Sequence, residues 1–134
     1  MSIEGSSMTE RPRLEQRLRE LYEVRLNGSL ERLCGLFAPE VQFRIAGTSD
    51  GKPIAIGAQG MEAVRPWLSM LVKTFRLSDH AVLSLLVDGD RAAVHWSARV
   101  HSRITGSQAS TEFIDLVTFR DLQIVSYAEF FVPH

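Results

Sequence analysis

The chain lacks the features on which many secreted and membrane proteins depend. Its only cysteine, Cys34, excludes an internal disulfide and a cysteine-based zinc cluster, and we expect it to be buried on an apolar helix stripe. No apolar run approaches the roughly 20 residues that a membrane helix needs. The first residues also lack the apolar segment of a signal peptide. We therefore expect a cytoplasmic protein.

The chain also has almost no net charge. Fifteen basic and sixteen acidic residues give a formal net charge of −1. Without a global electrostatic field, the protein has no general attraction for polyanions. The sequence therefore predicts neither nucleic acid nor a membrane as a partner.

Common cofactor and catalytic motifs are missing too. In "GTSDGK" only three residues separate the glycines, and Pro53 follows the lysine, so the phosphate-binding loop pattern is not met. There is no Gly-x-Ser-x-Gly nucleophile elbow and no His-Glu-x-x-His helix. His95 and His101 share a strand face, but six residues place them roughly 20 Å apart. The sequence predicts neither a metal nor a cofactor.

The length of 134 residues suits one domain. We expect a flexible tail over residues 1–13 and a single domain over residues 14–134. Apolar residues with helical spacing predict an amphipathic helix at Leu14–Leu26 and a further helix at Met61–Phe75, the latter interrupted by Pro66.

Between these helices the pattern changes twice. Ser29 can cap a second helix that continues through Phe37 and is closed by Pro39. "VQFRI" alternates as a short strand should, with Arg44 on its outer face. The glycine-rich stretch 47–60 is long for a connection, so it is either a functional loop or lid, or a solvated connection or short hairpin.

Four strands fill the rest of the chain. Short turns, among them the Asp-Gly hairpin signal at residues 88–90, join them into an antiparallel meander. The strands are "HAVLSLLV", "RAAVHWSARVHSRI", "TEFIDLVTF" and "IVSYAEFFV". Together the patterns predict an α+β fold with three helices packed on one face of a strongly curved antiparallel sheet.

The strings "NGSLERLCGLFAPEVQF", "GMEAVRPWL" and "FIDLVTFRDLQIVSYAEFF" resemble, in this order, the NTF2-like superfamily and its SnoaL-like or ketosteroid-isomerase-like branch. The resemblance runs from about Leu14 to Val132. It implies a cystatin-like cone with an internal apolar pocket, and an outer sheet face that often forms a homodimer. The fold hosts isomerases, cyclases, dehydratases, epoxide hydrolases and binding modules, so it does not fix function. Leu122 stands where relatives usually have glycine.

Asp115 is the leading candidate for chemistry. Strand alternation places it on one face with Phe113 and Val117. Its position resembles that of the protonated aspartic acid which, in ketosteroid isomerases, donates a hydrogen bond to an oxyanion. Tyr22 lies close to the position of the oxyanion-binding tyrosine in that family, although core packing explains Tyr22 equally well.

Glu129 is the second candidate. It shares a strand face with Tyr127 and Phe131, and the short turn before its strand directs it toward the same pocket as Asp115. Its position resembles that of a water-activating acid in epoxide hydrolases. Their arginine and aspartate, two residues apart, are absent here, because Arg99 is followed by Val100 and His101.

The resemblance to ketosteroid isomerases also has a gap. Their proton-shuttling carboxylate aligns with Arg44 or Ile45, and neither residue can act as that base. We therefore do not expect steroid isomerisation by the mechanism of that family.

The sequence thus predicts a pocket for a small, largely apolar molecule, with Asp115, Glu129 and Tyr22 as catalytic candidates. The candidate pocket walls are Trp67, Trp96, Val100, Phe113, Val117, Tyr127 and Phe131. A one-residue slip in strand register would exchange Trp96 for His95. The alternatives are a non-catalytic dimerisation or binding module and an epoxide-hydrolase-like enzyme. The sequence does not decide whether the protein is an enzyme.

Overall fold

The structure is a computed structural model that describes residues 3–134, with side chains from residue 11 onward. Within this part of the chain, three helices and six strands confirm the predicted α+β class. In chain order they are α1 (Ile3–Asn27), α2 (Leu30–Cys34), β1 (Phe37–Ser49), β2 (Lys52–Gln59), α3 (Met61–Lys73), β3 (Phe75–Asp88), β4 (Arg91–Ser102), β5 (Gln108–Arg120) and β6 (Gln123–Pro133).

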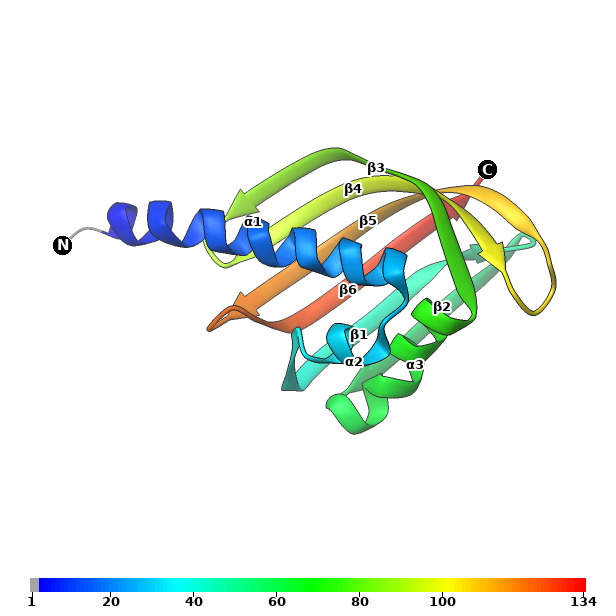
Figure 1. The fold of residues 1–134 in the computed structure, drawn as a ribbon, viewed down its shortest axis with the longest axis horizontal. Coiled ribbons are helices and arrows are strands. Elements are labelled where there is room, and N and C mark those ends of the chain that lie inside the picture. The colour runs from blue at the N-terminus through cyan, green and yellow to red at the C-terminus, as the bar shows by residue number, and fades with distance from the viewer. Residues whose placement is uncertain (1–2) are drawn as a thin grey trace.

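The six strands form one curved sheet in the order β2-β1-β6-β5-β4-β3. Neighbouring strands are antiparallel except β1 and β6, which are parallel. Figure 1 shows the sheet bending around α1, while α2 and α3 lie beside β1 and β2. The apolar core fills the space between the helices and the concave face, as the predicted strand alternation requires.

Helix α1 begins earlier than the sequence predicts. The predicted helix starts at Leu14, but the helical backbone starts at Ile3. Residues 1–13, predicted to be a flexible tail, are thus helical from Ile3 onward, and their mobility stays a prediction. Met1 and Ser2 lie outside the described residues.

The second helix is shorter than predicted, because β1 begins at Phe37 rather than at Val41. Phe37 pairs with Ile124 of β6, so a parallel strand contact replaces the expected last helical turn. Pro39 therefore lies inside β1, where the register with β6 shifts, and a strand irregularity is a position that tolerates proline.

The stretch 47–60 is neither a loop nor a lid. It forms the end of β1 and all of β2, a regular hairpin, so the short-hairpin alternative was correct. Asp50 and Gly51 have φ angles of 52° and 75°, as the two central residues of a type I′ turn require. Gly47 permits close packing here, because a Cβ atom would lie 2.5 Å from the carbonyl oxygen of Phe131.

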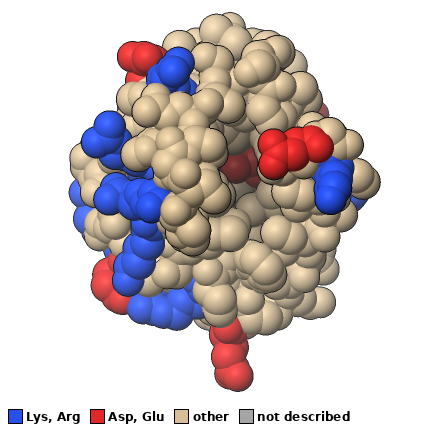
Figure 2. Space-filling model, turned by 90° about the vertical axis from the view of Figure 1, so that its right-hand side faces the viewer, with Lys and Arg blue, Asp and Glu red and all other residues tan. Residues whose placement is uncertain are grey.

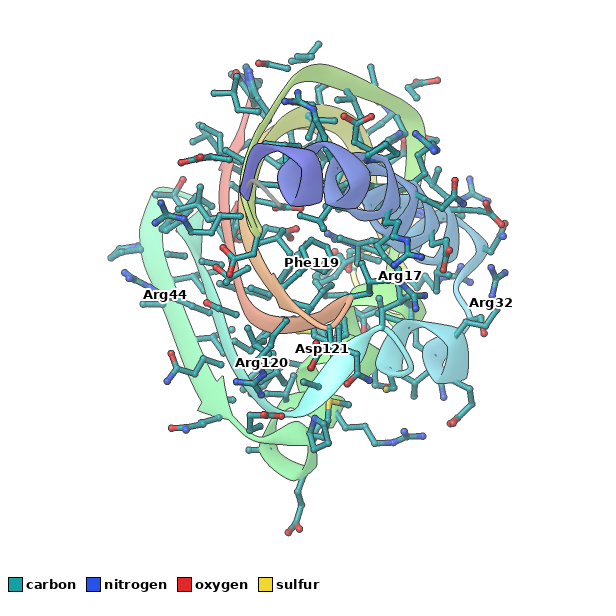
Figure 3. The ribbon with its side chains drawn as sticks, turned by 90° about the vertical axis from the view of Figure 1, so that its left-hand side faces the viewer. Arg17, Arg32, Arg44, Phe119, Arg120 and Asp121 are labelled. Carbon is teal, nitrogen blue, oxygen red and sulfur yellow. The ribbon has the colours of Figure 1, made fainter. Side chains whose placement is uncertain are left out.

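The β5–β6 turn holds a leucine in a left-handed conformation. Asp121 and Leu122 have φ angles of 53° and 63°. Such a conformation costs a branched L-residue about 1–2 kcal/mol. The Leu122 side chain packs against the core, and this contact offsets part of that cost. Figure 3 views this end of the molecule and shows Arg44 on the outer side of β1, exposed as predicted.

Candidate functional site

The two acids are direct neighbours across β5 and β6. Asp115 is paired with Glu129, and both face the concave side of the sheet. Their side chains are enclosed by the core, since Asp115 is 0% and Glu129 2% exposed. Strand alternation and a short turn predicted this juxtaposition from the sequence.

Helix α1 adds two polar side chains from the opposite side. Its buried stripe contains Leu14, Leu18 and Leu21, and both Tyr22 and Arg25 continue it toward the sheet. Arg25 was missed by the sequence analysis. The signal was available, because a position four residues after a buried leucine lies on the same helical face.

Asp115 receives its hydrogen bonds on a single oxygen. Tyr22 donates to Oδ2 at 2.7 Å, and the Trp96 indole N–H donates at 2.9 Å. The hydroxyl oxygen of Tyr127 lies 2.8 Å from the same atom. Among the described residues, no group bonds to the buried Oδ1. The carboxyl group is therefore half satisfied.

This environment favours a neutral Asp115. Burial raises the pKa of Asp115 well above its usual range, and the charge of Glu129 raises it further, whereas Arg25 and the Tyr22 hydrogen bond oppose the change. Burial, followed by the charge of Asp115, also raises the pKa values of Tyr22 and Tyr127, so both phenols stay protonated. The raised pKa favours the protonated form of the Asp115 carboxyl group.

Glu129 is paired with Arg25. The Arg25 Nη1 group donates to Glu129 Oε2, and Nη2 lies 3.4 Å from Oε1, so the guanidinium faces both carboxylate oxygens. Burial lowers the pKa of Arg25, but the charge of Glu129 outweighs it and the net shift is upward. The buried Glu129 carboxyl group thus has a charged partner within the core.

Aromatic rings enclose the acid pair. The Trp96 ring stacks on Phe113 at 3.8 Å between centroids, and the Arg25 guanidinium lies 5.0 Å from the Trp96 centroid. Trp96 therefore occupies the inner face. His95 points outward and contacts Glu112, so the register question of the sequence analysis is settled in favour of Trp96.

A strand irregularity brings one further histidine to this cluster. The β3–β4 register shifts between Ser78 and Ala81, where Asp79 has a φ angle of 54°. The shift places the His80 ring 5.4 Å from both Tyr22 and Trp96. Burial and the charge of Arg25 lower the pKa of His80, which favours a neutral ring.

A cavity of about 250 Å³ opens beside the acid pair. Its rim includes the β1–β2 hairpin, the β4–β5 connection and Pro133, which Figure 1 places at one end of the molecule. Figure 2 looks at this end and shows a hollow with acidic atoms inside it. Among the described residues, Glu129 is the only carboxylate that lines the cavity, and Arg25 lies with it.

The other walls are largely apolar. They include Ile45, Ile56, Leu71, Leu77, Val100, Phe113 and Phe131. Val100, Phe113 and Phe131 were among the predicted wall residues. Trp67, Trp96, Val117 and Tyr127 do not line the cavity.

The three catalytic candidates differ in whether they line the cavity. Asp115 and Tyr22 do not reach the cavity, whereas Glu129 does. Asp115 lies behind Glu129, where Tyr127 contacts both acids. The two acids therefore have different access to a ligand.

The part of the chain that the structure describes has neither a cluster of potential metal ligands nor a helix suited to cross a bilayer. Its histidines, cysteine and acids form no group of three or more that could hold a metal ion. None of its helices combines the length and the apolar character needed to span a bilayer.

A curved sheet wrapped around a helix is the architecture of the NTF2-like class of α+β proteins. Within that class the chain belongs to the SnoaL-like domain family, whose model matches residues 18–127. No curated protein matches the chain.

Solved structures share the fold at low sequence identity. A Bacillus subtilis protein provisionally named an isomerase is 19% identical, with a TM-score of 0.76 over 91% of this chain and 88% of that one. A Burkholderia xenovorans NTF2-like protein is 18% identical, with a TM-score of 0.72 over 90% and 89%. An LEH-like epoxide hydrolase of M. tuberculosis is 8% identical, with a TM-score of 0.70 over 91% and 84%. These likenesses concern the fold alone.

Proposed function

We propose that the protein binds a small, largely apolar molecule in the cavity and acts on it by proton transfer through Glu129. One observation carries this proposal: a buried carboxylate, held by Arg25, faces an otherwise largely apolar cavity. Acid–base catalysis needs a carboxyl group within hydrogen-bonding reach of the substrate, shielded from bulk water. The reaction class is that of an isomerase, cyclase or dehydratase.

The position of each residue relative to the cavity suggests its role in this proposed function. The apolar walls select the ligand by desolvating it, and Glu129 accepts or donates the proton. Arg25 orients the Glu129 carboxylate through its two donor nitrogens. Asp115 contributes through the hydrogen-bond network rather than by touching the ligand, because it lies outside the cavity. The support for the assignment of Glu129 is thus its access to the cavity.

Filling the cavity tests ligand binding. We expect Ala109→Phe, which places a ring among the wall residues, to weaken binding of an apolar fluorescent probe such as ANS at least about tenfold. Ala93→Phe is the matched control, because Ala93 lies on β4 outside the cavity. Fluorescence titration gives both affinities. Equal probe binding by wild type and Ala109→Phe would contradict a cavity site.

A screen of small apolar carbonyl, alcohol and epoxide compounds then tests catalysis. We expect Glu129→Gln to abolish turnover while keeping probe binding within a fewfold of wild type. A cavity that binds such compounds without turning any of them over would favour the non-catalytic module.

Epoxide hydrolysis is a second candidate, favoured by one contact. The arginine and aspartate, two residues apart, that accompany the acid in those enzymes are not found at Arg99, but Arg25 of α1 supplies a guanidinium to Glu129. A carboxylate held in this way can activate a water molecule for attack on an epoxide. Conversion of epoxides to diols by the wild type would select this candidate.

We also propose a homodimer formed through the outer sheet face. Ile114, Leu116 and Val132 are 45%, 47% and 56% exposed on adjacent strands β5 and β6. An apolar patch of this kind is typical of an association surface. We expect Leu116→Lys to shift the protein to monomers in analytical ultracentrifugation, while Leu26→Lys, at an exposed leucine of α1, leaves the mass unchanged. A monomeric wild type would refute the proposal.

A further inference from the structure

The Tyr127 hydroxyl group lies between the two acids. Its oxygen is 2.8 Å from Asp115 Oδ2 and 2.9 Å from Glu129 Oε2, and both are hydrogen-bond distances. A phenol has one hydrogen, so it can make a linear hydrogen bond of full strength to one acid only. Arg25 Nη1 donates to the same phenol oxygen at 3.1 Å and cannot satisfy the other acid contact.

The geometry therefore favours a proton on one of the two acids. If both were ionised, one of the two short contacts to Tyr127 would join lone pairs without a hydrogen between them, inside the core. A proton on Asp115 Oδ2 removes this conflict, because Asp115 then donates to Tyr127 and Tyr127 donates to Glu129. It also makes the buried cluster neutral, since the charge of Glu129 balances that of Arg25.

We propose that Asp115 and Glu129 share one proton and that Tyr127 carries it between them. Asp115 would hold the proton behind the cavity, and Glu129 would present it inside the cavity. This inference deepens the proposed function, because it rests on Glu129 as the group that meets the ligand. It assigns Tyr127 and Asp115 as a proton relay for that residue.

The transfer is balanced without any other reactant. The O–H bond of Tyr127 breaks as its proton passes to Glu129 Oε2. At the same time the O–H bond of Asp115 breaks, and its proton passes to the phenol oxygen of Tyr127. Glu129 is then a neutral acid, Tyr127 is again a phenol, and Asp115 carries the negative charge. The total charge of the cluster does not change.

Both end states are provided for by the surrounding groups. When Glu129 is ionised, Arg25 faces both of its oxygens. When Asp115 is ionised, Oδ2 accepts from Tyr22, Trp96 and Tyr127 together. Charge on either acid is thus met by donors already in place. Glu129 can therefore serve as a base in one state and as an acid in the other.

The shared proton is tested without any ligand. Protein with ¹³C-labelled carboxyl groups is examined by NMR at neutral pH, where we expect one ionised and one protonated carboxyl group, Glu129 and Asp115 respectively. Glu129→Gln removes the negative charge that raises the pKa of Asp115 and leaves that of Arg25, which lowers it, so we expect the Asp115 resonance to change to that of a carboxylate. Two ionised carboxyl groups in the wild type would overturn the inference.

The relay itself is tested by the rate of proton exchange. After transfer of the protein to D₂O, the deuterium isotope shift of the Asp115 carboxyl resonance reports exchange of its proton. We expect Tyr127→Phe to slow this exchange at least tenfold. Tyr22→Phe is the matched control, since Tyr22 also donates to Asp115 but does not contact Glu129. A purely structural role predicts equal rates in the two variants.

The outcomes separate the two proposals. Unchanged exchange in Tyr127→Phe, or slowing in Tyr22→Phe alone, would exclude Tyr127 as the route. If Tyr127→Phe does not fold, the Glu129→Gln titration still decides whether the proton is shared. Probe binding by Ala109→Phe tests the cavity and leaves the relay intact. Proton exchange in Tyr127→Phe tests the relay without a ligand. Either proposal can therefore fail while the other holds.

Discussion

Replacing Arg25 with methionine is expected to destabilise the protein by about 3–5 kcal/mol at neutral pH. The substitution keeps the length and most of the apolar contacts of the side chain, but it leaves the Glu129 carboxylate without a counter-charge at 2% exposure. The loss should shrink as the pH is lowered, because Glu129 can then take up a proton and become neutral. Urea unfolding at several pH values measures the effect.

Two comparisons identify the cause. Arg17→Met removes an arginine from the same helix, but Arg17 pairs with Glu20 at the surface, so less than about 1 kcal/mol should be lost. Combining Arg25→Met with Glu129→Leu replaces both charges by apolar groups and should recover most of the stability. A loss of under 1 kcal/mol in Arg25→Met alone would mean that Glu129 is not desolvated.

The fold and half of the site could be predicted from local patterns. Strand alternation assigned Asp115 and Glu129 to buried faces, and a short turn brought those faces together. Both conclusions depend only on residues close in sequence. The conclusions hold because strand side chains alternate with a period of two, so one known inward residue fixes the face of every other residue on that strand.

Arg25 could not be predicted in the same way. It lies 104 residues from Glu129 in sequence, and the ion pair depends on how α1 crosses the sheet. Its helical position marked it as inward-facing, but an arginine near a helix end is also a common surface residue. Tertiary packing, which local periodicity does not report, decides between these possibilities.

The predictions that failed near β1 have a similar cause. Phe37 fits the apolar stripe of a second helix, yet pairing with β6 makes it a strand residue. The hairpin at Asp50 and Gly51 did have a local signal, the Asp-Gly pair between Ser49 and Lys52. Its glycine-rich surroundings, including Gly47, kept the loop or lid open as an alternative to the hairpin, but Gly47 serves close packing rather than loop flexibility.

The access of the two acids was also beyond sequence reasoning. Both occupy equivalent inward positions on paired strands, but the cavity reaches Glu129 and stops short of Asp115. The difference arises because the rings of Tyr22 and Trp96 occupy the space next to Asp115. Side-chain volume, rather than strand phase, therefore decides which acid can meet a ligand.

The buried proton on Asp115 should make the stability of the protein fall as the pH rises. Unfolded Asp115 releases its proton near pH 4, whereas the raised pKa of the folded carboxyl group retains it. Above about pH 4 the folded state thus binds one more proton than the unfolded state. Its free energy of unfolding then decreases by about 1.4 kcal/mol per pH unit, until the folded group also ionises.

Asp115→Asn should lack this contribution. We expect it to gain about 1.4 kcal/mol per pH unit relative to wild type above about pH 5, until folded Asp115 ionises, since an amide does not titrate. Taking the difference between the two curves cancels the titration of distant groups. The neighbours that face Asp115, namely Tyr22, Arg25, His80, Tyr127 and Glu129, remain in both proteins.

An exposed aspartate supplies the control for this experiment. Asp88, whose side chain is 92% exposed, should give parallel stability curves when replaced by asparagine. Parallel curves for Asp115→Asn as well would show that folded Asp115 is already ionised. A break in the difference curve of Asp115→Asn would instead mark the pH at which the folded protein releases the shared proton. Tyr127→Phe should move that break to higher pH, because it removes one of the hydrogen bonds that stabilise ionised Asp115.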